Sequence, residues 1–180
     1  MPVGLHILTG HGAPSRRMLA EQGPIDFLTG LMGLPDEVIY SFSDIVFSGV
    51  LERFPKLNLI SAENEIGWIP FWLHMADQWW GRYKESQKNE LTMPPSDYYK
   101  RQIYATFLED PIGIRCAPLP QVGYGNFMWG NDYPHGSSTW PHSRKVIDTI
   151  MAGVSAADRQ KMLTDTCARV YGLKLPETVA

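Results

Sequence analysis

Acidic and histidine side chains follow or interrupt the short apolar runs of this sequence, where they could act together in catalysis. The run NFMWG leads into Asp132 and His135, and the run LNLISA leads directly into Glu63. His6 lies within the run VGLHIL near the start of the chain. Carboxylates and imidazoles transfer protons and bind divalent cations. These residue types predict acid–base or metal-assisted chemistry, although Asp132 could equally serve only to form a turn before the following proline.

Four apolar runs have the length and the β-branched or aromatic content of strands, and they cover residues 3–8, 57–62, 103–107 and 126–130. Apolar residues at helical spacing fill the stretches 36–54, 66–85, 143–153, 156–163 and 165–172. Strands that alternate with helices predict an α/β protein with a parallel sheet. Active sites of such proteins gather at the carboxyl ends of the strands, so we expect His6, Glu63 and Asp132 to lie at one edge.

Composition narrows the class of protein. The 180 residues fit one domain (1–180), and a hydrophobic content of 44% is typical of a globular chain with a core. A net charge of −3 without a basic block argues against nucleic acid as a partner. Cys116 and Cys167 are far apart and lack metal-site spacing, which favours a reducing compartment. No apolar run reaches membrane-spanning length, so we expect a cytoplasmic protein with no membrane partner.

Several longer motifs together resemble the amidohydrolase-related family, which includes the aminocarboxymuconate-semialdehyde decarboxylase-like enzymes. The motifs are FSGVLERFPKLNLISAE, GWIPFWLHMAD, MWGNDYPHGSSTWPHS and the terminal CARVYGL. The resemblance spans nearly the whole chain. It implies a (β/α)₈ TIM barrel with one metal ion, of which this chain is a half barrel corresponding to about strands five to eight with the C-terminal helices.

The resemblance also implies roles for individual side chains. His6 matches a metal ligand of strand five, and Asp132 matches the strand-eight aspartate that contacts the metal and handles protons. Glu63 stands where the family often has a catalytic histidine, and we assign it a catalytic role. His135 and His11 are expected at the substrate. The structural alternatives are a packed histidine for His6 and solvated side chains for Glu63 and His11.

The remaining histidines are expected to be structural or, for His74, structural or exposed. His74 falls within an expected amphipathic helix, and His142 precedes a helix that it could cap. The family's first strand carries an H-x-H pair of metal ligands, and none of the five histidines here are two positions apart. The implied metal is zinc, with manganese as the second choice, and we expect weak binding by this chain alone.

The resulting hypothesis is a metal-dependent hydrolase of a small molecule that acts through metal-activated water, or a related non-oxidative decarboxylase (a carboxy-lyase). The alternative is a non-catalytic remnant or interaction module that needs an amino-terminal half for activity. A half barrel leaves strand edges unpaired at residues 3–8 and 126–130, which favours association. The expected partner is therefore a second copy, in a homo-oligomer that Trp79 and Trp80 could face, or an amino-terminal half barrel.

Overall fold

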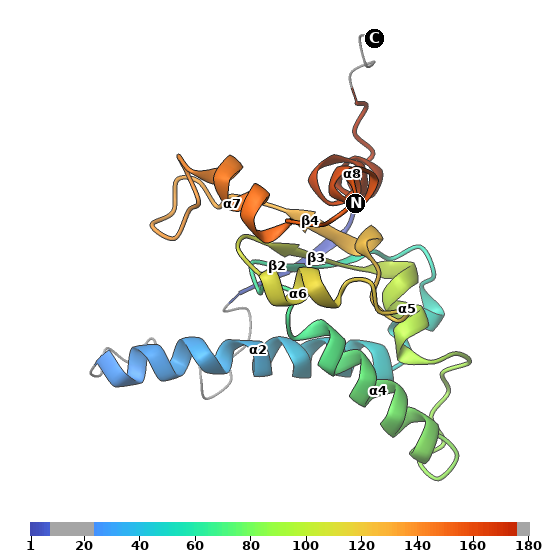
Figure 1. The fold of residues 1–180 in the computed structure, drawn as a ribbon. Coiled ribbons are helices and arrows are strands. Elements are labelled where there is room, and N and C mark those ends of the chain that lie inside the picture. The colour runs from blue at the N-terminus through green and yellow to red at the C-terminus, as the bar shows by residue number, and fades with distance from the viewer. Residues whose placement is uncertain (8–23, 176–180) are drawn as a thin grey trace.

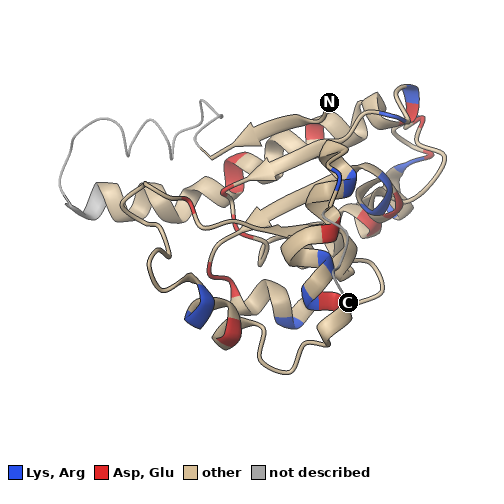
Figure 2. Cartoon of the chain, turned by 90° about the horizontal axis from the view of Figure 1, so that it is seen from above, with Lys and Arg blue, Asp and Glu red and all other residues tan. Residues whose placement is uncertain are grey.

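A four-stranded parallel sheet forms the centre of the computed structural model, which describes residues 1–7 and 24–175. Its strands lie in the order β1 (Val3–His6), β2 (Leu59–Ala62), β3 (Ile103–Phe107) and β4 (Phe127–Trp129). Neighbouring strands pair in parallel register, with His6 opposite Ala62, and their arrowheads point to the same edge of the sheet (Figure 2). The α/β class and the parallel sheet are thus confirmed, and β1 and β4 are the outer strands.

Helices connect each pair of strands, as parallel neighbours require. The β1–β2 connection contains α2 (Pro24–Phe47) and α3 (Val50–Arg53), and the β2–β3 connection contains α4 (Ile69–Tyr83) and α5 (Pro95–Gln102). The β3–β4 connection contains α6 (Pro111–Cys116) and the short 3₁₀ helix η1 (Tyr124–Asn126). After β4 come α7 (Ser143–Ile150), α8 (Ala156–Gln160), the π-helical segment η2 (Lys161–Asp165) and α9 (Thr166–Tyr171). Among the described helices, none is both long and apolar enough to cross a bilayer.

The larger core lies between one face of the sheet and helices α2 and α4 (Figure 1). Every fourth residue along α2 is buried, namely Leu34, Val38, Phe42 and Val46. This spacing keeps the apolar side chains on one side of the helix. Phe42 packs against Trp72 of α4, with ring centroids 6.1 Å apart. Alternate strand residues such as Leu59 and Phe107 face this core.

The terminal helix covers part of the other face of the sheet. Val170 of α9 packs against Ile60, Tyr104 and Met128, one residue from each of three strands. Figure 1 shows α8 on the opposite side of the sheet from α2 and α4. Arg169 donates a hydrogen bond of 2.6 Å to the Gly125 carbonyl, just before β4. This contact fixes α9 near the amino-terminal end of the strands and leaves their carboxyl ends accessible.

The element boundaries differ from expectation in several places. The helix expected at 36–54 begins at Pro24 and ends at Phe47, because Gly49 adopts a left-handed φ of 73° before α3. The helices expected at 156–163 and 165–172 are joined by η2. Helices α5 and α6 were not predicted. Both are short and begin at proline, so they lack the long apolar stripe that identifies a helix.

Candidate functional site

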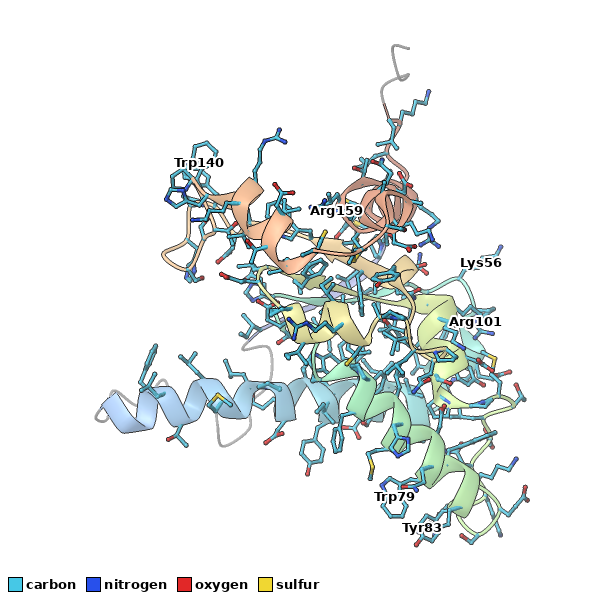
Figure 3. The ribbon with its side chains drawn as sticks, in the orientation of Figure 1. Lys56, Trp79, Tyr83, Arg101, Trp140 and Arg159 are labelled. Atoms are coloured by element: carbon cyan, nitrogen blue, oxygen red, sulfur yellow. The ribbon has the colours of Figure 1, made fainter. Side chains whose placement is uncertain are left out.

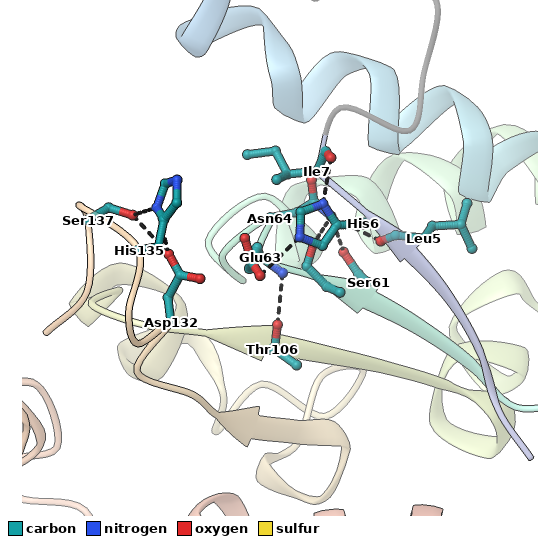
Figure 4. A network of polar contacts seen from close by, with 11 residues as sticks. Leu5, His6, Ile7, Ser61, Glu63, Asn64, Thr106, Asp132, His135 and Ser137 are labelled. Atoms are coloured by element: carbon teal, nitrogen blue, oxygen red, sulfur yellow. Dashed lines mark hydrogen bonds and ion pairs between the residues drawn. The ribbon is translucent and has the colours of Figure 1, made fainter. Parts of the chain in front are cut away.

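His6 and Glu63 form a pair at the carboxyl ends of β1 and β2. The Nε2 atom of His6 lies 3.0 Å from Oε1 of Glu63, and the two side chains point toward one another (Figure 4). The Nδ1 atom of His6 lies 2.8 Å from the carbonyl oxygen of Ile7, which can only accept, so Nδ1 carries a proton. In the neutral tautomer, Nε2 therefore presents a lone pair to a carboxylate. A proton or a metal cation makes that contact favourable.

The pKa of His6 is raised above its ordinary value. The hydrogen bond to the Ile7 carbonyl is the largest cause, and partial burial opposes it. The carboxylates of Glu63 and Asp132 add to the increase. Asp132, on the loop after β4, is the smallest of these causes. The net effect favours a positive charge on His6.

Asp132 belongs to a second group of polar side chains, on the loop after β4 (Figure 4). Its Oδ2 atom accepts a hydrogen bond of 3.0 Å from the Ser137 hydroxyl and lies 3.0 Å from Nδ1 of His135. The Asp132 side chain is 14% exposed, whereas that of His135 is 71% exposed. The loop therefore holds one carboxylate oxygen in a fixed direction.

Both candidate catalytic carboxylates sit on unusual backbone. Glu63 has φ 61° and Asp132 has φ 57°, values in the left-handed region that non-glycine residues seldom adopt. The Glu63 N–H donates a hydrogen bond of 2.8 Å to Oγ1 of Thr106 on β3, which stabilises this turn. Strained residues of this kind concentrate at functional sites because the surrounding structure must hold them in place.

Acidic residues predominate around the strand ends. The segments 63–68, 108–110 and 130–139 contain Glu63, Glu65, Glu109, Asp110 and Asp132 but no Lys or Arg. Burial raises the pKa of Glu65, and its hydrogen bonds from the backbone of Glu109 and Leu108 oppose the increase. An edge of the sheet with this charge attracts cations.

Two of these acids have structural roles. Asp110 accepts hydrogen bonds from the backbone N–H of Ile66 (2.9 Å), Gly67 (2.5 Å) and Gly113 (2.8 Å), and so joins the β2 loop to the start of α6. Glu65 accepts bonds from the N–H groups of Leu108 and Glu109. These contacts connect the loops after β2 and β3.

The donor set matches part of a divalent metal site. An imidazole nitrogen and carboxylate oxygens suit zinc or manganese. Within residues 1–7 and 24–175, however, no group of three or more His, Cys, Asp or Glu side chains lies close enough to hold an ion. His6 and Asp132 remain the predicted ligands, and the described residues alone do not complete a site.

The other predicted histidines have varied positions. His11 lies outside the described residues. His74 is exposed on α4, as expected. His142 occupies the N-cap position of α7, as predicted, and its side chain makes no capping hydrogen bond. Cys116 and Cys167 are free and partly buried.

Two polar residues at the site were missed by sequence reasoning. Thr106 faces Glu63 from β3, and Ser137 bonds to Asp132. The position of Thr106 one residue before the end of an expected strand was the available signal. Ser137 lies in a run of small polar residues, and the sequence does not indicate which of their hydroxyls forms a hydrogen bond with Asp132.

The fold is similar to those of solved (β/α)₈ enzymes. One is 2,6-dihydroxybenzoate decarboxylase from Rhizobium, with a TM-score of 0.72 and 18% identity over 96% of this chain and 51% of that chain. Another is 5-carboxyvanillate decarboxylase LigW from Sphingomonas paucimobilis, with a TM-score of 0.66 and 24% identity over 79% of this chain and 42% of that chain. An amidohydrolase from Mycobacterium avium subsp. paratuberculosis K-10 gives a TM-score of 0.70 and 19% identity over 94% and 42% of the two chains.

These matches support the fold expected from the sequence. The chain spans between 42% and 51% of the length of these three barrels, in agreement with a half barrel. A family model described as amidohydrolase matches residues 5–173, which include His6, Glu63 and Asp132. The chain therefore belongs to the amidohydrolase family.

Proposed function

We propose that this chain supplies the carboxyl-terminal half of the active site of a metal-dependent carboxy-lyase. The observation that carries the proposal is the position of His6, Glu63 and Asp132 at one edge of a parallel sheet. The His6–Glu63 contact is 3.0 Å, and the carboxylate of Asp132 makes the smallest contribution to the raised pKa of His6. The three residues end or follow three different parallel strands, at the edge where barrel enzymes carry out their chemistry.

In this proposal each side chain has a defined task. His6 and Asp132 contribute ligands to a divalent metal, and His11 and His135 lie at the substrate. Asp132 transfers a proton, and Ser137 orients its carboxylate through the 3.0 Å hydrogen bond. Glu63 keeps His6 in position and is the second group able to move a proton. The chemistry that the metal supplies is polarisation of an oxygen atom of the substrate.

Decarboxylation of an aromatic acid is the favoured reaction. The solved relatives include decarboxylases for 5-carboxyvanillate and for 2,6-dihydroxybenzoate. A dihydroxybenzoic acid decarboxylase from Polaromonas sp. JS666 has bound manganese, which favours manganese over zinc as the ion. Hydrolysis of a small molecule remains the second reaction, because a metal and a strand-end carboxylate serve it equally well.

The ligands still required are proposed to come from a segment with an H-x-H strand that packs beside β1 or β4. A catalytic zinc site has three protein ligands as a rule, and the described part of this chain is proposed to contribute two. The competing function is a non-catalytic interaction module. The incomplete ligand set among the described residues is the observation that favours it.

The test measures decarboxylation of 2,6-dihydroxybenzoate with Mn²⁺, using the chain together with an amino-terminal half barrel that carries H-x-H. We expect turnover that requires both parts and the metal, and that falls by about 100-fold or more in Asp132→Asn. His74→Asn is the matched control, since His74 is exposed on α4. Turnover of an ester substrate alone would favour the hydrolase, and no turnover of either would favour the interaction module.

A further inference from the structure

Asn64 is a buried polar residue that directly follows Glu63 and has no part in the chemistry proposed above. Its side chain belongs to a residue that is only 8% exposed, and a buried amide is costly unless its polar atoms form hydrogen bonds. The residues on both sides, Glu63 and Glu65, have left-handed φ values of 61° and 52°. A buried side chain between two strained residues is typical of a position that the surrounding contacts define.

The Asn64 amide connects the carboxyl ends of β1 and β2. Its Nδ2 atom donates hydrogen bonds to the Ala62 carbonyl at 2.9 Å and to the Ser61 hydroxyl at 3.1 Å, both on β2. The same nitrogen donates a longer hydrogen bond of 3.4 Å to the Leu5 carbonyl on β1. Figure 4 shows the Asn64 amide beside Leu5 and Ser61. An amide nitrogen carries two hydrogens, so its donor capacity is used within this group.

These hydrogen bonds reach His6 through Ile7. The Ala62 carbonyl that accepts from Asn64 also accepts the Ile7 N–H at 3.0 Å. The carbonyl of Ile7 in turn accepts a hydrogen bond of 2.8 Å from Nδ1 of His6. Asn64 therefore acts on the residue that fixes the His6 ring, whose Nε2 atom lies 3.0 Å from Glu63.

We propose that Asn64 is a positioning residue for the His6–Glu63 pair, because it holds the ends of β1 and β2 at the separation that this pair requires. Partners that orient metal ligands through hydrogen bonds change metal affinity by about 10–100-fold when they are replaced. The inference rests on the proposed function only for its effect on metal binding, since the orientation of His6 can be measured without a metal.

Asn126 is a matched control at the other end of the sheet. It is also 8% exposed, and its Nδ2 atom donates to the backbone carbonyls of Tyr99 (3.0 Å), Lys100 (3.2 Å) and Ile103 (2.7 Å). Asn126 directly precedes β4, whereas the candidate site lies where the strands end. Figure 3 shows Arg101, next to these acceptors, and Trp140, on the loop after β4, at opposite ends of the sheet.

The experiment compares Asn64→Leu and Asn126→Leu in the full chain. Leucine has a similar size to asparagine but no donor, and it adds neither a charge nor a metal ligand. At a pH where the ring is neutral, the nitrogen chemical shifts of His6 report which ring nitrogen carries the proton. We expect a proton on Nδ1 in the parent chain and in Asn126→Leu, and a mixture of the two tautomers in Asn64→Leu.

The second measurement is a titration with Mn²⁺ alone. We expect the affinity to fall by about tenfold or more in Asn64→Leu and to stay within about twofold in Asn126→Leu. Asn64→Ser also lacks the amide and should give the same changes, which covers the case in which the leucine variant does not fold. Circular dichroism spectra show which variants are folded.

An unchanged His6 signal in the folded Asn64 variants, or an equal change in Asn126→Leu, would overturn the proposal. Loss of the fold in both Asn64 variants would make Asn64 a structural residue and would overturn it as well. If the parent chain binds no Mn²⁺ and the His6 signal changes only in the Asn64 variants, the positioning role is supported and the proposed metal-dependent function fails.

Discussion

At the scale of single residues, two carboxylates and one imidazole define the candidate site. Their residue types and strand-end positions were readable from the sequence, and the structure places His6, Glu63 and Asp132 at the same edge of the sheet. The orientation of the side chains was not readable. It depends on the hydrogen bond that His6 donates to the Ile7 carbonyl and on the one that Ser137 donates to Asp132. It also depends on the left-handed backbone at Glu63 and Asp132.

Replacement of Glu63 by glutamine tests its catalytic role. Glutamine retains the shape of the side chain but cannot take up a proton, and it pairs more weakly with a charged His6. In the complete enzyme we expect Glu63→Gln to lower kcat by about 100-fold while KM changes little. Steady-state kinetics measure both constants. Unchanged kcat would mean that Glu63 is only a solvated acid. Glu109→Gln is the control, because Glu109 is a neighbouring exposed acid.

Thr106 is predicted to stabilise the strained turn at Glu63. Thr106→Val retains the shape of the side chain and removes the oxygen that accepts the Glu63 N–H at 2.8 Å. We expect the free energy of unfolding to fall by about 1 kcal/mol, as measured by urea denaturation. Thr149→Val is the control, because the Thr149 hydroxyl bonds only within the exposed surface of α7. An equal effect in both variants would mean that the Glu63 turn does not depend on Thr106.

At the scale of elements, the four strands were predicted almost in full. Ile103–Phe107 was predicted to the residue, and the other three strands are shorter than expected. The residue pattern of a strand depends only on neighbouring residues, so the strands could be predicted from the sequence. Helices α5 and α6 depend on contacts with distant segments, since the start of α6 is fixed by Asp110 together with the loop after β2. Sequence periodicity does not contain that information.

Asp110 is the residue on which the connection between the β2 loop and α6 depends. It is 9% exposed and accepts three backbone hydrogen bonds. We expect Asp110→Ala to lower the free energy of unfolding by about 2–4 kcal/mol, because three N–H groups lose their acceptor. Chemical denaturation measures the loss, and Glu109→Ala should stay within about 0.5 kcal/mol. A loss of similar size in both variants would contradict this role for Asp110.

At the scale of the whole molecule, the chain is a half barrel with accessible strand ends. Composition and helix–strand alternation predicted the α/β class, and the resemblance to a family predicted which half of the barrel is present. The sequence did not indicate that α9 would pack Val170 onto Ile60, Tyr104 and Met128. That contact joins Val170 to residues between 42 and 110 positions away. The apolar pattern of α9 alone does not specify which face of the sheet it covers.

The central claim is that His6 and Asp132 contribute to a metal site that the described residues do not complete. Its most direct test is a titration of the full chain with Mn²⁺, with free Mn²⁺ followed by electron paramagnetic resonance. We predict weak binding that is lost in His6→Ala and Asp132→Ala, retained in His74→Ala, and strengthened by about 10–100-fold when an H-x-H half barrel is added. Tight, stoichiometric binding by the chain alone that persists in His6→Ala and Asp132→Ala would contradict the claim.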